Sequence, residues 1–468
     1  MMSATFTERA KTAVQDIPFR DALAIATTRF ADGRVAKMGE LPDPDGLRDR
    51  GRAIRRATLE NLDQHLANLA DAVEAAGGHV HWALDGDEAC QIIADIARQH
   101  DVELAVKSKS MTSEEIELNH VLEAQSITVV ETDLGEWIVQ LAGERPSHII
   151  APAVHKTIED VIELFEKATG EKDLPAEIPA LTAVARRTLR ERFIRAGIGI
   201  SGVNFAIAET GTIVIVTNEG NGRFITSLPP VHVAIMGVDK VVRTWNDWAI
   251  LLPLLTRSAT GQRLSSYVTA VTGPRRAGDV DGPQEFHLVI MDNGRSEILD
   301  SRFRESLACI RCGACMNVCP VYAEVGGHAY GSVYPGPIGA VITPLFQGLD
   351  EPSELPWAST LCGACLDACP VRIDLPRMLI ELRQEHVERG LVGRGERLAF
   401  RWFGWLVRWR FLFDLAAWMG WLVQRPFARN GRVTSAPPPL SAWTRYRDWP
   451  ALADRSFNRR WKDLERET

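Results

Sequence analysis

The chain has 468 residues, 46% of them hydrophobic, and a net charge of −8, so it can bury two or three cores and is far too long for a small carrier peptide. Residues 391–468 carry 15 Lys or Arg against 7 Asp or Glu, which leaves −16 on the rest. Because the chain as a whole is acidic and has no recognition motif, these features argue against a nucleic-acid-binding protein. The N-terminal segment lacks the basic stretch and continuous apolar run of a secretory signal, so we expect a cytoplasmic protein with reduced thiols.

Residues 1–76 show helical periodicity, for example in ATLENLDQHLANLADAVEAA, and predict a helical N-terminal preface. From 77 to 295, short β-rich runs such as VELAVK, ITVVE, TIVIV and VHVAIMG alternate with helical ones. Alternation on this scale predicts an α/β domain with a mostly parallel sheet. We find no nicotinamide, flavin or P-loop fingerprint in it.

Two places in the α/β region are candidates for binding an anion. Lys107, Ser108 and Lys109 lie at the end of the strand VELAVK and precede a helix, whose N-terminus can receive an anion. An equally good interpretation is a solvated helix cap. Arg223 closes the run NEGNGR and can clamp a carboxylate with two hydrogen bonds. The Asn and Gly residues of that run also suit a tight turn, the interpretation we favour.

The strongest signal is a cluster of seven cysteines within 61 residues, in a predicted module spanning residues 300–385. Cys309, Cys312, Cys315 and Cys319, followed by a proline, match the ferredoxin pattern C-x2-C-x2-C-x3-C-P. Thiolates two residues apart on a tight turn reach three corners of one cluster, and the fourth cysteine leads to the other cluster. Zinc sites more usually separate two C-x2-C pairs by a long loop.

A second copy of the motif lacks its first cysteine, because Ser359 stands where that cysteine would be. Under crossed ligation, the two ligand sets are Cys309, Cys312, Cys315 and Cys369 for the first cluster, and Cys319, Cys362 and Cys365 for the second. The second cluster is then a [3Fe–4S] cluster, or a [4Fe–4S] cluster completed by a hydroxyl, a carboxylate, water or a partner. We interpret Ser359 as a loop residue rather than a ligand.

The C-terminal region, residues 386–468, contains an aromatic stretch from 401 to 423. Charged residues interrupt this stretch near its middle, so it does not predict a transmembrane helix. Tryptophan, leucine and phenylalanine mixed with arginine suit an interfacial helix, a docking surface, or a helix that covers the protein's own core. We therefore expect peripheral contact with the inner face of the membrane at most.

The cysteine motifs, the segments GGHAYG and GPIGAV between them, and the upstream runs KSKSMTSEEIELNH and ETGTIVIVTNEGNGR resemble the lactate utilization protein B family over nearly the whole chain. The resemblance implies an α/β LUD domain of the folate cyclo-ligase and CoA-transferase-like type. It also implies a helical ferredoxin-type module with two [4Fe–4S] clusters and a short helical C-terminal region. Two partner proteins are implied as well, a cysteine-rich iron–sulfur subunit and a second LUD-domain protein.

These features predict an iron–sulfur electron-transfer subunit of a complex that oxidises L-lactate to pyruvate. The chemistry on lactate is expected on a partner, because the chain shows no flavin motif or catalytic base. One alternative is a subunit for glycolate or another 2-hydroxy acid. A second is an α/β transferase or ligase whose clusters sense redox state, and a third is an assembly scaffold whose clusters brace the fold.

Overall fold

The computed structural model describes residues 5–350, 354–438, 440–444 and 447–455, together with positions 457, 460, 461 and 465. The chain divides into two compact units, Met1–Glu385 and His386–Thr468. The first unit contains the α/β domain and the cysteine module. The second contains the aromatic and basic C-terminal region.

The first unit is built on a six-stranded sheet in which every neighbouring pair of strands is parallel. In spatial order its strands are β1 (His79–Ala83), β10 (Glu285–Met291), β7 (Val231–Gly237), β4 (Ile198–Gly202), β2 (Leu104–Lys107) and β3 (Thr128–Glu131). The chain order reverses between β2 and β4. All seven residues of β7 are buried, as expected of a parallel strand covered on both faces. The predicted mostly parallel sheet is therefore confirmed.

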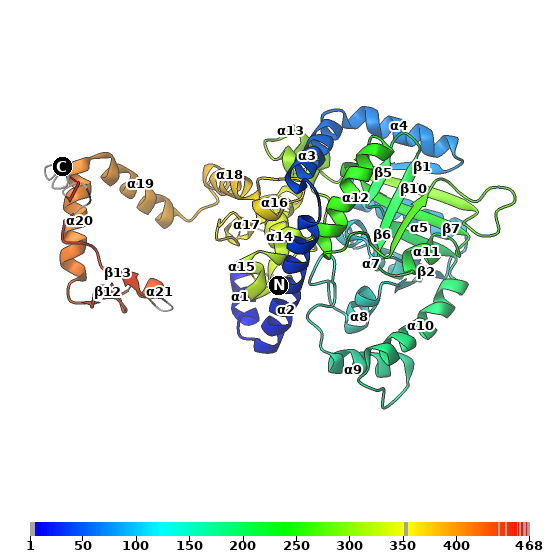
Figure 1. Cartoon of the computed structure of the whole chain (residues 1–468), viewed down its shortest axis with the longest axis horizontal. Coiled ribbons are helices and arrows are strands. Elements are labelled where there is room, and N and C mark those ends of the chain that lie inside the picture. Colours follow the sequence, from blue (N-terminus) through cyan, green and yellow to red (C-terminus); the bar gives the residue numbers. More distant parts are fainter. Residues whose placement is uncertain are drawn as a thin grey trace. The chain divides into compact units, whose positions relative to one another are not determined.

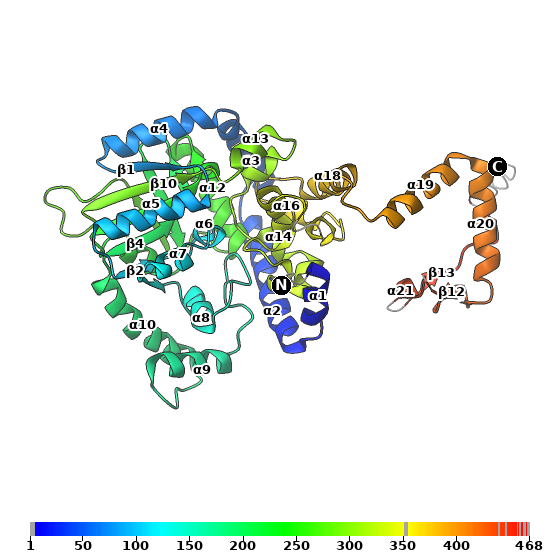
Figure 2. The same ribbon diagram turned by 180° about the vertical axis from the view of Figure 1, so that it is seen from behind.

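Helices cover the face of this sheet that Figure 2 turns toward the reader. Apolar residues of α5 and α7 form one buried cluster with the sheet. The helices of the α/β region are α5 (Gly86–Gln99), α6 (Met111–Glu115), α7 (Leu118–Ala124), α8 (Leu134–Ala142), α9 (Ile158–Thr169), α10 (Ile178–Arg195), α11 (Asn221–Ile225), η1 (Val238–Lys240), α12 (Trp245–Ala259) and α13 (Arg295–Asp300).

A smaller four-stranded sheet packs on the other face, which is turned toward the reader in Figure 1. Its spatial order is β8 (Val241–Val242), β5 (Phe205–Ile207), β6 (Thr212–Thr217) and β9 (Tyr267–Val271). The run TIVIV is β6, and it pairs antiparallel with β5 and β9 rather than joining the large parallel sheet. The short connection from β5 explains this, since Gly211 has φ +65° and lets the chain reverse directly.

The N-terminal region is helical, but it packs into the body of the protein. Its helices are α1 (Phe6–Ala13), α2 (Ile17–Gly39), α3 (Pro44–Glu60) and α4 (Leu62–Ala75). Asp16 and Asp43 cap α2 and α3, each accepting a hydrogen bond from the backbone N–H of the third helical residue. Apolar residues of α2 and α3 belong to the same buried cluster as the cysteine module and α12. One hydrophobic core thus joins the N-terminal helices, the α/β domain and the cysteine module.

The cysteine module consists of short helices joined by tight turns, next to α2 in both Figure 1 and Figure 2. They are η2 (Arg304–Ala308), α14 (Ala314–Asn317), α15 (Pro320–Val325), η3 (His328–Tyr330), α16 (Gly336–Gln347), η4 (Leu355–Trp357), α17 (Ala364–Ala368) and α18 (Leu375–Glu388). The two short helices α14 and α17 each begin inside a cysteine motif and contact each other. They bring the two motifs together.

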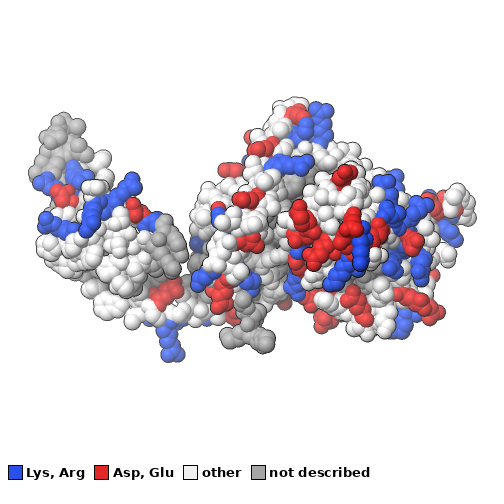
Figure 3. Space-filling model, turned by 90° about the horizontal axis from the view of Figure 1, so that it is seen from below, with Lys and Arg blue, Asp and Glu red and all other residues white. Residues whose placement is uncertain are grey.

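The second unit contains two 15-residue helices, α19 (Arg394–Arg408) and α20 (Arg410–Gln424), that meet at Trp409. Three two-residue strands, β11 (Ala428–Arg429), β12 (Arg432–Val433) and β13 (Trp449–Pro450), and the short helix α21 (Ser441–Thr444) follow. Many aromatic side chains of this unit are exposed. In Figure 3 its basic side chains lie beside broad uncharged areas. Within the described ranges, no helix is both long and apolar enough to cross a membrane.

Candidate metal centre

The two cysteine motifs fold into loops with the same backbone conformation. Arg311 and Leu361 hold equivalent places and both adopt positive φ, +56° and +54°. Such values are uncommon for residues other than glycine, so their recurrence marks one repeated turn. Gly313 and Gly363 follow with φ +76° and +87°, and a short helix then begins in each loop.

Ser359 occupies the position in the second loop that Cys309 occupies in the first. The Arg311 backbone N–H donates to Cys309 Sγ at 3.4 Å. The Leu361 backbone N–H likewise donates to Ser359 Oγ, at 3.1 Å. The serine hydroxyl therefore holds the place of the missing thiol, which sequence reasoning treated only as a loop position.

The first thiol group comprises Cys309, Cys312, Cys315 and Cys369. Burial, followed by the charges of Cys309 and Cys369, raises the pKa of Cys312 above its ordinary value. The pKa of Cys315 is likewise raised by burial and by the charges of Cys309, Cys312 and Cys369. These three charges thus all act on Cys315, although Cys369 comes from the other motif.

The second thiol group comprises Cys319, Cys362 and Cys365. Burial and the charges of Cys319 and Cys362 raise the pKa of Cys365 to about 12. Cys362 is exposed, and a hydrogen bond from the Thr360 hydroxyl lowers its pKa. The last cysteine of each motif thus interacts electrostatically with thiols of the other motif, as crossed ligation would require.

The residues present fit iron–sulfur clusters. All eight cysteines, each within the described part of the chain, are free thiols. Backbone N–H groups point at the sulfur atoms, including those of Ala314 at Cys312 and Ile338 at Cys315. Sulfurs that repel one another when ionised, and that accept backbone hydrogen bonds, form a donor set suited to a cluster of iron cations.

Arginine side chains surround the first thiol group, and three of them come from the N-terminal helices. Arg48 donates to the Asp367 carbonyl at 2.7 Å and to the Cys369 carbonyl at 2.9 Å. Arg55, 2% exposed, donates to the Leu307 carbonyl at 3.0 Å. Arg34 and Arg311 also interact with charges of this group. The N-terminal helices therefore position the cysteine loops and supply positive charge beside them.

Comparison with known proteins identifies the family of each region. The LUD domain family matches residues 66–291, and the 4Fe-4S dicluster domain family matches residues 305–373. The lactate utilization protein B of Geobacillus sp. (strain WCH70) is 47% identical, covering 96% of this chain and 94% of its own. That of Shouchella clausii (strain KSM-K16) is 45% identical, covering 99% and 98%. The chain belongs to the lactate utilization protein B family.

This member of the lactate utilization protein B family is accordingly an iron–sulfur protein with a LUD domain, a ferredoxin-type module and a helical C-terminal region. The fold class expected from the sequence is confirmed. Among solved structures, a DUF162 family protein from Deinococcus radiodurans covers 49% of this chain and 98% of its own at 14% identity. Its TM-score is 0.28, so that likeness carries no argument.

The structure separates the four anion-binding candidates. Lys107 is fully buried and its ammonium group pairs with Glu114 at 2.6 Å and Glu131 at 2.8 Å, so it is not available to a ligand. Ser108 is buried beside it. Lys109 lines a cavity. Arg223 is exposed, lies over the Tyr267 ring at 5.7 Å and is not among the residues that line that cavity.

Sequence reasoning missed the arginines that surround the first thiol group. Arg48 and Arg55 lie on α3, more than 250 residues before the carbonyl groups of the cysteine module that they bind. The one available signal was an amphipathic helix with arginines among the residues of its apolar face. Arg311 lies inside the first motif, and its guanidinium lies 4.9 Å from the Tyr334 ring centre.

Proposed function

We propose that this chain carries two [4Fe–4S] clusters and relays single electrons within a complex that oxidises L-lactate to pyruvate. The observation that carries the proposal is the presence of two thiol groups drawn from both motifs, in which every thiol except the exposed Cys362 belongs to or packs against one buried core. Two neighbouring clusters suit electron relay better than a purely structural role, for which one cluster would normally suffice. The lactate-utilization name of its relatives supports the substrate.

The proposed ligands of the first cluster are Cys309, Cys312, Cys315 and Cys369, and those of the second are Cys319, Cys362 and Cys365. When bound, such clusters supply one-electron transfer. The chain's own residues bury most of these thiols away from water, direct backbone N–H groups at the sulfurs and place arginines beside the first group. Burial and hydrogen bonds to sulfur are the means by which proteins set cluster potentials.

We further propose that Ser359 supplies the fourth ligand of the second cluster. Its hydroxyl has the backbone setting of the Cys309 thiol, down to the N–H donated from two residues later. This revises the interpretation of Ser359 as a plain loop residue. A [3Fe–4S] cluster at that site remains the competing form.

The proposed partners are a cysteine-rich iron–sulfur subunit and a second LUD-domain protein, acting in the cytoplasm. The exposed aromatic and arginine side chains of the second unit suit a docking surface for one of them, or peripheral contact with the inner face of the membrane. The chemistry on lactate would belong to a partner, and this chain would carry the electrons away.

The test is electron paramagnetic resonance on anaerobically purified protein, as isolated and after dithionite, with iron and sulfide counted. Two interacting reduced four-iron signals support the relay, whereas protein without paramagnetic iron in either state contradicts it. Deleting the gene and measuring growth on L-lactate and on glycolate then separates the substrates. Loss of growth on glycolate alone would favour the 2-hydroxy-acid alternative.

A further inference from the structure

A cavity of about 420 Å³ lies at the carboxyl ends of the strands of the large sheet. Lys109 and Ser110 follow β2, and Gly202 ends β4, the two strands between which the chain order reverses. Asp133 follows β3, and Lys240 follows β7. In open α/β sheets, ligands bind outside the carboxyl ends of the strands at such a reversal. The volume also falls within the range of small-molecule sites.

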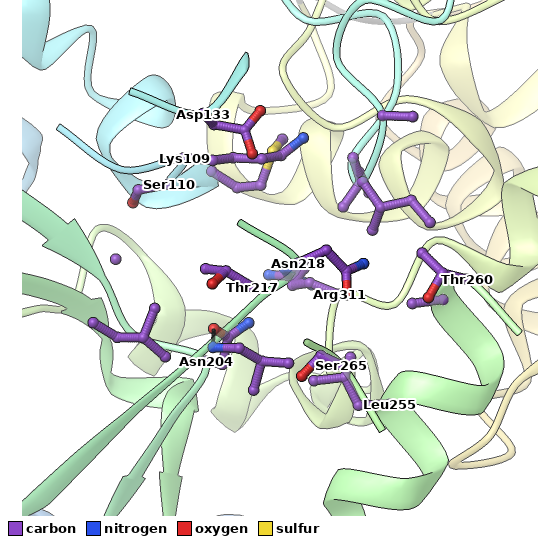
Figure 4. Close-up of a pocket in the computed structure, with 18 of the residues that line it drawn as sticks. Lys109, Ser110, Asp133, Asn204, Thr217, Asn218, Leu255, Thr260, Ser265 and Arg311 are labelled. Carbon is purple, nitrogen blue, oxygen red and sulfur yellow. Dashed lines mark hydrogen bonds between the residues drawn. The ribbon is translucent and has the colours of Figure 1, made fainter. Parts of the chain in front are cut away.

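The cysteine module completes this cavity. Ile310, Arg311 and Tyr334 line it together with residues of the α/β domain. Because Arg311 lies between Cys309 and Cys312, the cavity borders the loop that carries the first thiol group. In Figure 4, Lys109, Ser110 and Asp133 lie on the upper side of the cavity, and Asn204, Leu255 and Ser265 lie on the lower side.

The Lys and Arg side chains that line the cavity have N–H donors that their ion pairs do not use. Arg311 is 3.8 Å from Asp239, and Lys109 and Lys240 are each 3.6 Å from their acidic neighbours. Charge-assisted hydrogen bonds are about 2.7–2.9 Å long, so these ion pairs do not use the donors. Lys107, which does not line the cavity, pairs at 2.6 and 2.8 Å.

Several buried polar groups that line the cavity have no hydrogen-bond partner in the described part of the chain. The Arg311 side chain is 8% exposed, and none of its three nitrogens has a hydrogen-bond partner among the described residues. Asn221 is 5% exposed and lines the cavity, and both of its amide atoms also lack a partner within the described ranges. Buried polar groups are nearly always satisfied, so their coincidence in one cavity points to a ligand.

The remaining lining restricts the chemistry of that ligand. Ile149, Val203 and Leu255 provide apolar walls. Burial and the nearby charge of Asp133 raise the pKa of Glu219 to about 7, so this carboxyl group opposes an anion only weakly at neutral pH. Arginine and amide groups beside an apolar wall match a carboxylate carried on an apolar body.

We propose that this cavity binds a small organic carboxylate, with its charged end on Arg311, Lys109 and Asn221 and its apolar body against the aliphatic wall. This assigns a ligand site to the α/β domain, which the proposed electron relay leaves without a role. Its place against the first cysteine loop puts the ligand beside the proposed first cluster.

The test is calorimetric titration of anaerobically purified, cluster-loaded protein with 4-methylpentanoate, with the uncharged 4-methylpentanamide as the matched ligand. The acid should bind, and the amide should bind at least about tenfold more weakly. Asn221→Leu and Lys109→Met should each weaken the acid about ten- to hundredfold, because each removes hydrogen bonds to a charged group. Arg311 is left intact because it lies between two cysteines of the first group.

Arg223→Ala is the control variant, since Arg223 lies on α11 with Asn221 but outside the cavity. It should bind the acid as the unaltered protein does. Iron content and circular dichroism establish that each variant is folded, and Lys109→Met carries the test if Asn221→Leu is not. Failure of the acid to bind, equal binding of acid and amide, or unchanged binding by the folded variants would overturn the proposal. None of these results depends on whether the chain relays electrons.

Discussion

The two cysteine loops share one backbone conformation, yet the two thiol groups they build have different surroundings. The first group has four thiols, of which three are less than 10% exposed, and arginines of α2 and α3 lie beside it. The second has three thiols, one of them exposed, and a serine in the fourth position. The repeated turn therefore determines the positions of the proposed ligands. Segments far away in the sequence determine the local charge and the exposure to water at each site.

In the proposed relay, this difference would give the two clusters separate tasks. An iron–sulfur cluster becomes more negative when reduced, so nearby arginines stabilise its reduced form and raise its potential. The first cluster should therefore hold the electron more tightly. The second, with exposed Cys362, is the one better placed to exchange electrons with a partner.

The largest expected effect comes from removing one cysteine, because this tests which loop serves which cluster. Cys369→Ala should abolish the first cluster and retain the second, lowering bound iron by about half. Cys365→Ala, four residues earlier in the same motif, should abolish the second cluster instead. Iron analysis measures how much iron each variant loses, and paramagnetic resonance identifies which cluster is lost. If the two variants lost the same signal, crossed ligation would be wrong.

Oxidation should distinguish the two sites by their exposure. With limiting ferricyanide, we expect the second cluster to lose iron roughly several-fold faster than the first, because Cys362 is exposed. The three-iron signal that appears first should be missing from Cys365→Ala, which keeps only the first cluster. If the three-iron signal appeared equally fast in Cys365→Ala and in the unaltered protein, burial would not protect the first site.

The sequence indicates the proposed ligands of these sites because cluster spacing is local. Four cysteines within eleven residues suffice to indicate the motif, and the alternation of β-rich and helical runs indicates the parallel sheet. The proposed crossing of Cys319 and Cys369 also follows from the known pattern, and in the structure each of these cysteines interacts electrostatically with a thiol of the other motif.

The features that the sequence did not predict depend on contacts between distant segments. The sequence predicts a helical preface over residues 1–76. The arginines of this region bind backbone acceptors more than 250 residues later, which no local pattern encodes. Lys107 and Lys109 looked equivalent in one basic run. Lys107 ends β2 and meets Glu131 of the neighbouring strand, whereas Lys109 lies beyond the strand end and lines the cavity. Strand order, which the sequence did not specify, makes that distinction.

A smaller effect is expected when the two loops are made alike. Ser359→Cys places a thiol where the backbone already matches Cys309, so the second cluster should retain four irons and lose iron several-fold more slowly under ferricyanide. Ser359→Ala removes the hydroxyl and should favour the three-iron form. Mössbauer spectroscopy distinguishes the forms. Identical behaviour of the cysteine, alanine and unaltered proteins would exclude position 359 as a ligand.

The smallest effect should come from the charge that distinguishes the first site. Arg48→Met removes a cation that lies against Cys369 and should lower the potential of the first cluster by roughly 1–2 kcal/mol, or about 40–90 mV for one electron. The second cluster should shift less, because the proposed second ligands interact with Arg48 in none of the described contacts. Redox titration followed by paramagnetic resonance measures both potentials.

Two further variants decide whether charge or packing causes that shift. Arg48→Lys keeps the cation but loses the fork that binds two carbonyl groups, so a charge effect predicts that most of the potential is retained. Arg52→Met removes a cation of the same helix that is half exposed and paired with Glu305, where solvent screens it. A shift in Arg52→Met as large as that in Arg48→Met would mean that net charge, rather than the position of Arg48, separates the two sites.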